Sequence, residues 1–144
     1  LGLRMYYDTY RPILLKVSPD LSHEQLDEIV EYCLRSGIDG IVAGNTTRSR
    51  EGLTSISKEK IEAIGNGGMS GAPVHKRNLD LVKYVHTRSE GKLPIIGVGG
   101  IMSPEQAKAM LDAGASLVEI YSGFIFEGPA LIKNIIKYLE NDAK

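Results

Sequence analysis

The sequence has few of the residues on which several protein classes depend. Its 144 residues include one cysteine, Cys33, and no tryptophan. A single cysteine excludes a disulfide within the chain and argues against a disulfide scaffold. The formal net charge is −1 and no lysine- or arginine-rich run occurs, so we expect no nucleic-acid partner. No apolar stretch approaches the roughly 18 residues of a membrane span, and no secretory signal is visible.

Metal ligands and nucleophiles are also scarce. His23, His75 and His86 are scattered along the chain, and no cysteine–histidine spacing is typical of a zinc site. No spacing indicates a serine–histidine–aspartate or cysteine–histidine arrangement. We therefore predict no metal site and no nucleophilic triad or dyad in this chain, and we expect Cys33 on the apolar face of a helix.

Glycine, by contrast, is abundant, and the glycines cluster where apolar runs end. The stretch Leu93–Ile101 passes from apolar residues into Gly99 and Gly100, and Ser103-Pro104 then begins a helix. A similar apolar run, 116–120, ends in Tyr121-Ser122-Gly123. Buried parallel strands end in this way where backbone N–H groups approach an anion. Two such neighbouring ends predict one phosphate site between them.

The chain alternates apolar runs with amphipathic, capped segments. Helices are expected after the capping boxes at Ser22 and Ser103, over 74–88 and over 130–139, with Gly37 ending the first. The predicted strands are 12–17, 38–43, 93–101 and 117–121. Four consecutive strand–helix units imply a parallel α/β sheet.

The position of the polar residues favours one of two parallel architectures. An open doubly wound sheet is possible, but the ligand-like residues all follow strands, which is typical of a (β/α)8 TIM barrel. Such a barrel needs roughly 200 residues or more. We therefore predict that 12–144 form the C-terminal half of a barrel, βα units five to eight, preceded by a lead-in over 1–11.

A long polar segment, 48–73, separates the second strand from the next long helix. It contains one weakly helical piece, 57–64, and the glycine-rich run Gly67-Gly68-Met69-Ser70-Gly71. Loops of this length in a compact domain are usually functional or mobile. The glycines allow either a close approach to a ligand ring or a flexible loop.

Two polar groups accompany the first two predicted strands. Lys16 lies between apolar residues, where a buried ammonium is costly unless it is paired or meets an anion. It points either toward a barrel's interior or outward to solvent. Asn45-Thr46-Thr47 ends the second strand, and an amide suits a planar ligand with alternating N–H and C=O groups. A simple turn or helix cap explains these three residues at least equally well.

Five segments, taken together, resemble the quinone-dependent (class 2) dihydroorotate dehydrogenases, over about 12–139. They are Lys16-Val17-Ser18-Pro19-Asp20, Asn45-Thr46-Thr47, Gly67-Gly68-Met69-Ser70-Gly71, Ile96-Gly97-Val98-Gly99-Gly100-Ile101 and Tyr121-Ser122-Gly123-Phe124. The resemblance implies a (β/α)8 barrel with FMN as cofactor. It also implies oxidation of dihydroorotate to orotate in pyrimidine biosynthesis, with a membrane quinone as electron acceptor.

The resemblance implies roles for residues near the first two strands. Lys16 would contact the flavin ring, where its positive charge stabilises the anionic reduced flavin. Asn45 and Thr46 would hydrogen-bond the pyrimidine ring of the substrate. Gly44 stands where the family usually has a flavin-contacting threonine, so a backbone contact is retained and a hydroxyl contact is lost.

The resemblance assigns the later residues to the cofactor. Gly71, Gly100, Tyr121 and Ser122 would bind FMN, the last three around its phosphate. The family's catalytic serine lies upstream of this chain, as do the helices of its quinone tunnel. The resemblance therefore implies a segment that is inactive alone, soluble, and prone to self-association, taken from a protein peripheral to the cytoplasmic membrane.

Two alternatives remain open from the residues. A different phosphate-binding barrel enzyme, such as an aldolase or isomerase, would use the same glycine turns without flavin. A non-catalytic half-barrel would only fold or associate. Lys16 together with the 45–47 segment speaks against the first alternative, and flavin absorbance with the mass in solution would distinguish the second.

Overall fold

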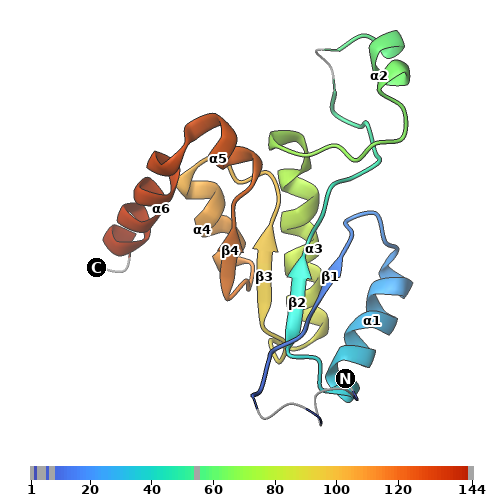
Figure 1. Ribbon diagram of the computed structural model, residues 1–144, viewed down its shortest axis with the longest axis vertical. Helices are drawn as coiled ribbons and strands as arrows, with labels where there is room; N and C mark the ends of the chain where they lie inside the picture. Colours follow the sequence, from blue (N-terminus) through green and yellow to red (C-terminus); the bar gives the residue numbers. More distant parts are fainter. Residues whose placement is uncertain (1, 3–5, 7–8, 54–55, 143–144) are drawn as a thin grey trace.

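A four-stranded parallel sheet forms the centre of the molecule (Figure 1). The structure is a computed structural model that describes residues 2, 6, 9–53 and 56–142. The strands are β1 (Leu14–Val17), β2 (Gly40–Ala43), β3 (Ile95–Val98) and β4 (Leu117–Glu119). They lie side by side in chain order, each parallel to the next. All four strands are shorter than predicted, because the chain is still or already in a loop at the missing positions. β1 and β2 begin two residues later than predicted, β3 is shorter at both ends, and β4 ends two residues earlier.

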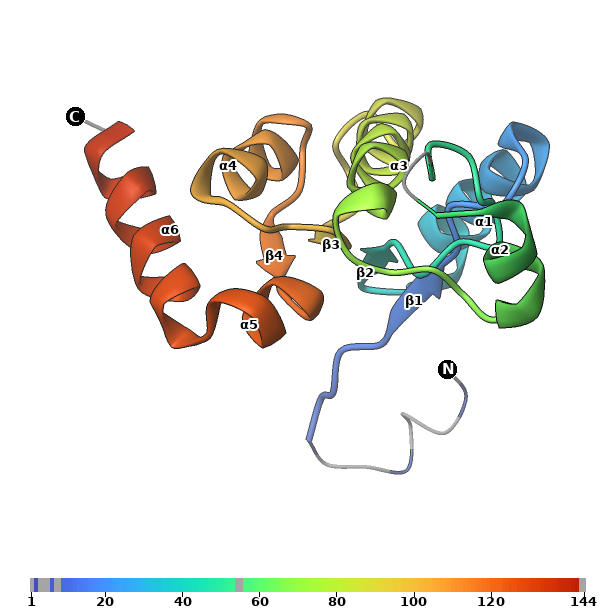
Figure 2. The same ribbon diagram turned by 90° about the horizontal axis from the view of Figure 1, so that it is seen from above.

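Helices follow each strand and cover one side of the sheet (Figure 2). The long helices are α1 (His23–Ser36), α3 (His75–Arg88), α4 (Pro104–Asp112) and α6 (Pro129–Asp142). Shorter pieces are α2 (Lys58–Ile64), the 3-10 turn η2 (Ala72–Val74) and α5 (Ser122–Glu127). The predicted α/β class and the four βα units of a TIM barrel are confirmed. Sequence analysis missed α5, where it expected only a turn.

The helix ends follow local chemistry. Ser22 accepts a hydrogen bond from the Gln25 N–H, and the Gln25 side chain accepts from the Ser22 N–H, so the predicted capping box is confirmed. Gly37 ends α1 in the left-handed conformation, with φ 76°.

The capping box predicted at the start of α4 is half right. Ser103 Oγ accepts from the Gln106 N–H, as expected. The Gln106 carboxamide, however, accepts from the Met102 N–H at 2.7 Å instead of from Ser103. The side chain therefore satisfies a donor one residue earlier than the motif requires.

The core lies between the sheet and its helices. Val17, Ile41 and Ile95 point from three strands to this side and are at most 3% exposed. Cys33 packs in the same cluster, as predicted, and burial raises the pKa of its thiol. Burying apolar surface here supplies the main driving force that holds each helix on the sheet.

The long helices leave the other face of the sheet uncovered in the part of the chain that the structure describes (Figure 2). Lys16, Val42, Ile96 and Leu117 share one row across the four strands on this face. Leu117 is 63% exposed, although it lies within a strand. In a closed barrel this face is the interior, so its apolar residues would be covered by further strands.

Candidate functional site

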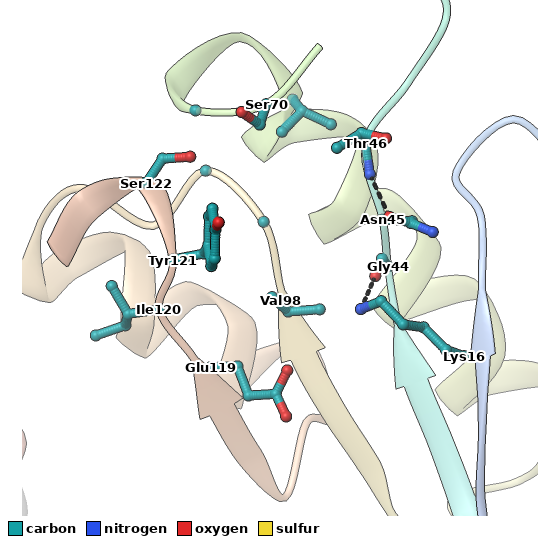
Figure 3. A pocket seen from close by; sticks show the side chains of 14 residues that line it. Lys16, Gly44, Asn45, Thr46, Ser70, Val98, Glu119, Ile120, Tyr121 and Ser122 are labelled. Atoms are coloured by element: carbon teal, nitrogen blue, oxygen red, sulfur yellow. Dashed lines mark hydrogen bonds between the residues drawn. The ribbon is translucent and has the colours of Figure 1, made fainter. Parts of the chain in front are cut away.

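A cavity of about 550 Å³ lies at the carboxyl ends of the strands (Figure 3). Loops after β2, β3 and β4 form its walls, and β1 contributes one side chain. The structure brings all eight residues predicted to bind cofactor or substrate to this cavity: Lys16, Gly44, Asn45, Thr46, Gly71, Gly100, Tyr121 and Ser122. Their individual roles stay predictions.

Lys16 extends from β1 into the cavity, so the alternative of an outward-pointing lysine is not what the structure shows (Figure 3). Its Nζ donates a hydrogen bond to the carbonyl oxygen of Gly44, at 2.7 Å. Lys16 lies on β1 and Gly44 directly follows the neighbouring strand β2, so this bond holds the ammonium at the cavity wall. It is the one basic group among the residues that line the cavity.

Asn45 and Thr46 present exposed side chains to the cavity, at the end of β2. The Thr46 N–H donates to Asn45 Oδ1 at 2.9 Å, a local bond of the kind that turns use. The two residues therefore form a local turn and line the cavity at the same time.

Thr47 behaves differently from its two neighbours. Its side chain is fully buried, and its hydroxyl donates to the carboxylate of Asp20. Its backbone pairs with Met69 in an isolated antiparallel bridge, with N···O distances of 3.1 and 2.7 Å. Thr47 thus ties the start of the long loop to its end and does not line the cavity.

Asp20 is the centre of this anchor, and sequence analysis assigned it no such role. Besides Thr47, it accepts from the Arg48 N–H at 2.8 Å and from Arg77 Nη1 at 3.0 Å. Burial alone raises the pKa of Asp20, but the bonds from Thr47 and Arg48 and the Arg77 charge outweigh it and lower the pKa. The carboxylate is therefore ionised at neutral pH and holds the loop.

The Gly99-Gly100 turn requires glycine. The two residues have φ angles of 120° and 69°, which side chains disfavour. A Cβ on Gly100 would also lie 2.6 Å from the His75 backbone nitrogen and 2.7 Å from the Gly71 carbonyl oxygen. The turn consequently packs its backbone directly against the loop that contains Gly71 and the start of α3.

The third wall comes from the end of β4. Ser122 lies near Gly71, because a Cβ on Gly71 would be 3.9 Å from the Ser122 Cβ. Tyr121 is 76% exposed and stands beside the cavity (Figure 3). Gly71, Gly100 and Ser122 thus bring backbone and one hydroxyl to the same end of the cavity, an arrangement that suits a phosphate group.

Glu119 also lines the cavity, and the sequence pattern predicts no role for it. It lies on β4 and its exposed side chain points into the cavity (Figure 3). Its register with Val98 places it on the sheet face that the long helices leave uncovered.

The donor set fits FMN. A phosphate needs close backbone approach and hydroxyls, which the glycine-bordered end offers at Gly71, Gly100 and Ser122. A flavin ring needs a flat space with a cation that faces its reduced form, and Lys16 stands at the opposite side of the cavity. The described residues contain no group of three or more metal-ligating side chains.

A sheet of consecutive βα units with a ligand cavity at the strand ends defines part of a TIM-barrel protein. The family model for dihydroorotate dehydrogenase matches residues 5–142. This chain belongs to the dihydroorotate dehydrogenase family. The predicted resemblance to the quinone-dependent members is confirmed by the relatives below.

Curated relatives are named dihydroorotate dehydrogenase (quinone). The protein from Christiangramia forsetii is 50% identical over 125 residues, which cover 87% of this chain and 35% of the relative. The protein from Proteus mirabilis is 44% identical over 139 residues, covering 96% of this chain and 40% of the relative. The chain therefore spans well under half the length of these relatives.

Solved structures agree with the fold. The crystal structure of ligand-free dihydroorotate dehydrogenase from Eimeria tenella has a TM-score of 0.81 at 32% identity. The match covers 91% of this chain and 36% of that one. No helix in the described part of this chain is long and apolar enough to cross a membrane.

Proposed function

We propose that this chain supplies the FMN-phosphate cup and part of the orotate site of a quinone-dependent dihydroorotate dehydrogenase. The observation that carries the proposal is the convergence on one cavity of the eight residues to which the resemblance assigns a binding role. The whole protein would oxidise dihydroorotate to orotate in pyrimidine biosynthesis. FMN held in this cavity would supply the hydride-accepting chemistry and the onward transfer of electrons to a membrane quinone.

Each residue contributes by binding or by charge. The Lys16 ammonium, fixed by the Gly44 carbonyl, would face the flavin ring and stabilise its anionic reduced form. Asn45 and Thr46 would hydrogen-bond the pyrimidine ring. Gly44 would contribute backbone contacts only.

The residues at the glycine-bordered end of the cavity would hold the cofactor. Gly71, Gly100, Tyr121 and Ser122 would bind FMN, with the last three around the phosphate. Positioning of this kind lowers the entropic cost of bringing cofactor and substrate together.

We also propose that residues 12–144 are βα units five to eight of the barrel. The proton acceptor and the quinone site would then lie in other parts of the longer protein, which would be peripheral to the cytoplasmic membrane. The 144 residues alone would not turn over dihydroorotate. Their uncovered sheet face would favour self-association.

A titration with FMN and riboflavin tests the proposal, because the two ligands differ only in the phosphate. We expect FMN to bind the chain at least about tenfold more tightly, the equivalent of about 1.4 kcal/mol. Lys16→Met should weaken FMN binding. Lys133→Met, an exposed lysine on α6 away from the cavity, is the matched control and should leave it unchanged.

Two outcomes would contradict the proposal. Equal affinity for FMN and riboflavin would show that the chain does not bind the phosphate group of FMN. Binding of inorganic phosphate without any affinity for FMN would favour the alternative of a phosphate-binding barrel enzyme that uses no flavin.

A further inference from the structure

Asn78 is a polar residue in the core that the proposed function does not use. It lies on α3, behind the ends of β2 and β3, and is 0% exposed. Its Nδ2 donates to the backbone carbonyl of Asn45 at 3.1 Å. Its Oδ1 is buried and has no hydrogen-bond partner among the described residues. A buried carbonyl left in this state is costly, so its position needs an explanation.

Two glycines make room for the Asn78 carboxamide. A Cβ on Gly44 would overlap Asn78 Oδ1, and a Cβ on Gly99 would overlap Nδ2. The side chain thus fills the space that two missing side chains leave at adjacent strand ends. Oδ1 faces the Cα–H bond of Gly44 that a side chain would replace, which is at best a weak donor.

The segment that Asn78 contacts carries the ligand-facing groups. The Gly44 carbonyl accepts from Lys16 Nζ at 2.7 Å, and the Gly44 N–H donates to the Val98 carbonyl at 3.1 Å. The next carbonyl, of Asn45, accepts from Asn78 itself. The buried Asn78 carboxamide therefore contacts the backbone of both Gly44 and Asn45. Gly44 holds the Lys16 ammonium through its carbonyl, and Asn45 presents its own side chain to the cavity.

We propose that Asn78 is a positioning residue for the cavity, matched in size to Gly44. Its carboxamide fixes the Gly44-Asn45 backbone, and the Gly44 carbonyl in turn fixes the Lys16 ammonium. Gly44 and Asn78 form a pair in which a larger residue at 44 requires a smaller one at 78. The part that concerns the ligand rests on the proposed function, whereas the pairing itself does not.

A double-mutant cycle on urea unfolding tests the pairing without any ligand. Gly44→Ala should raise the unfolding equilibrium constant at least about tenfold when Asn78 is present. In the Asn78→Ala background the same change should cost less than about threefold, since the overlap with the carboxamide is removed and Leu81 Cδ2, 3.0 Å away, is the end of a flexible side chain. Gly67→Ala is the control, because its Cβ would enter open space and should have little effect in either background.

FMN affinity tests the link to Lys16. Asn78→Ala should weaken FMN binding about tenfold in the wild-type chain and less than about threefold in a Lys16→Met chain. A residue that only stabilises the core would lower affinity by the same factor in both backgrounds, and that result would overturn the positioning role.

The two experiments fail independently. If the wild-type chain binds no FMN, the proposed function fails, and the unfolding cycle still decides the pairing. If Gly44→Ala costs the same with and without Asn78, the pairing is wrong, whatever the chain binds.

Discussion

Replacing Gly100 by alanine should damage both the fold and the cavity, and the structure allows the size of the effect to be worked out. The residue has φ 69°, and a left-handed conformation costs about 1–2 kcal/mol for a residue with a Cβ. The new methyl would also lie 2.6–2.8 Å from backbone atoms of His75 and Gly71. Backbone cannot rotate away as a side chain can, so overpacking adds about 1–3 kcal/mol.

The expected loss of unfolding free energy is therefore about 2–5 kcal/mol. Gly37→Ala is the matched control, because Gly37 has φ 76° and open space around it. It should lose only the conformational part, about 1–2 kcal/mol.

Urea unfolding followed by far-UV circular dichroism measures both changes, since the chain has no tryptophan to report by fluorescence. Gly100→Ala should also abolish the preference for FMN over riboflavin, and Gly37→Ala should retain it. If Gly100→Ala costs no more than Gly37→Ala, the close packing of this turn against Gly71 and His75 is refuted.

Three further predictions follow from other parts of the molecule. Because the folded pKa of Asp20 lies below its ordinary value of 3.8, the carboxylate stabilises the fold above that pH and loses this contribution as the pH falls through the folded pKa. Asp20→Asn should thus cost about 1–3 kcal/mol at pH 7 and flatten the acid side of a stability–pH curve; an unchanged curve would contradict the anchor. Leu117→Gln, on the uncovered face of the sheet, should weaken self-association about tenfold in sedimentation velocity, and the control Ile132→Gln on α6 should not. Equal effects of the two changes would show that the chain does not associate through this face. Ser22→Ala should cost about 1 kcal/mol of unfolding free energy in urea through loss of the α1 cap, and no measurable cost would contradict the capping box.

Local sequence signals predicted much of the fold. The serine caps, Gly37 and the apolar runs each depend on residues a few positions apart, so their physics is visible in the sequence. The order of the units then implied a parallel sheet with all strand ends at one edge. For that reason the sequence predicts that the glycine turn at 99–100 and the residues at 121–122 lie together.

The parts that could not be predicted depend on partners distant in sequence. Asn78 contacts Asn45, 33 residues away, and Asp20 contacts Thr47, 27 residues away. On α3, Asn78 occupies a buried position that the apolar pattern alone would assign to a hydrophobic residue. The six-residue helix α5 could not be predicted either, because no capping side chain marks its start after β4.

The central claim is that the strand-end cavity holds the phosphate of FMN. An NMR titration of the 15N-labelled chain tests it most directly, because each backbone amide reports separately. With FMN, the account predicts chemical-shift changes centred on Gly71, Gly100, Tyr121 and Ser122, and with riboflavin much smaller changes at those amides. Shift changes centred elsewhere, or identical changes with the two ligands, would contradict it.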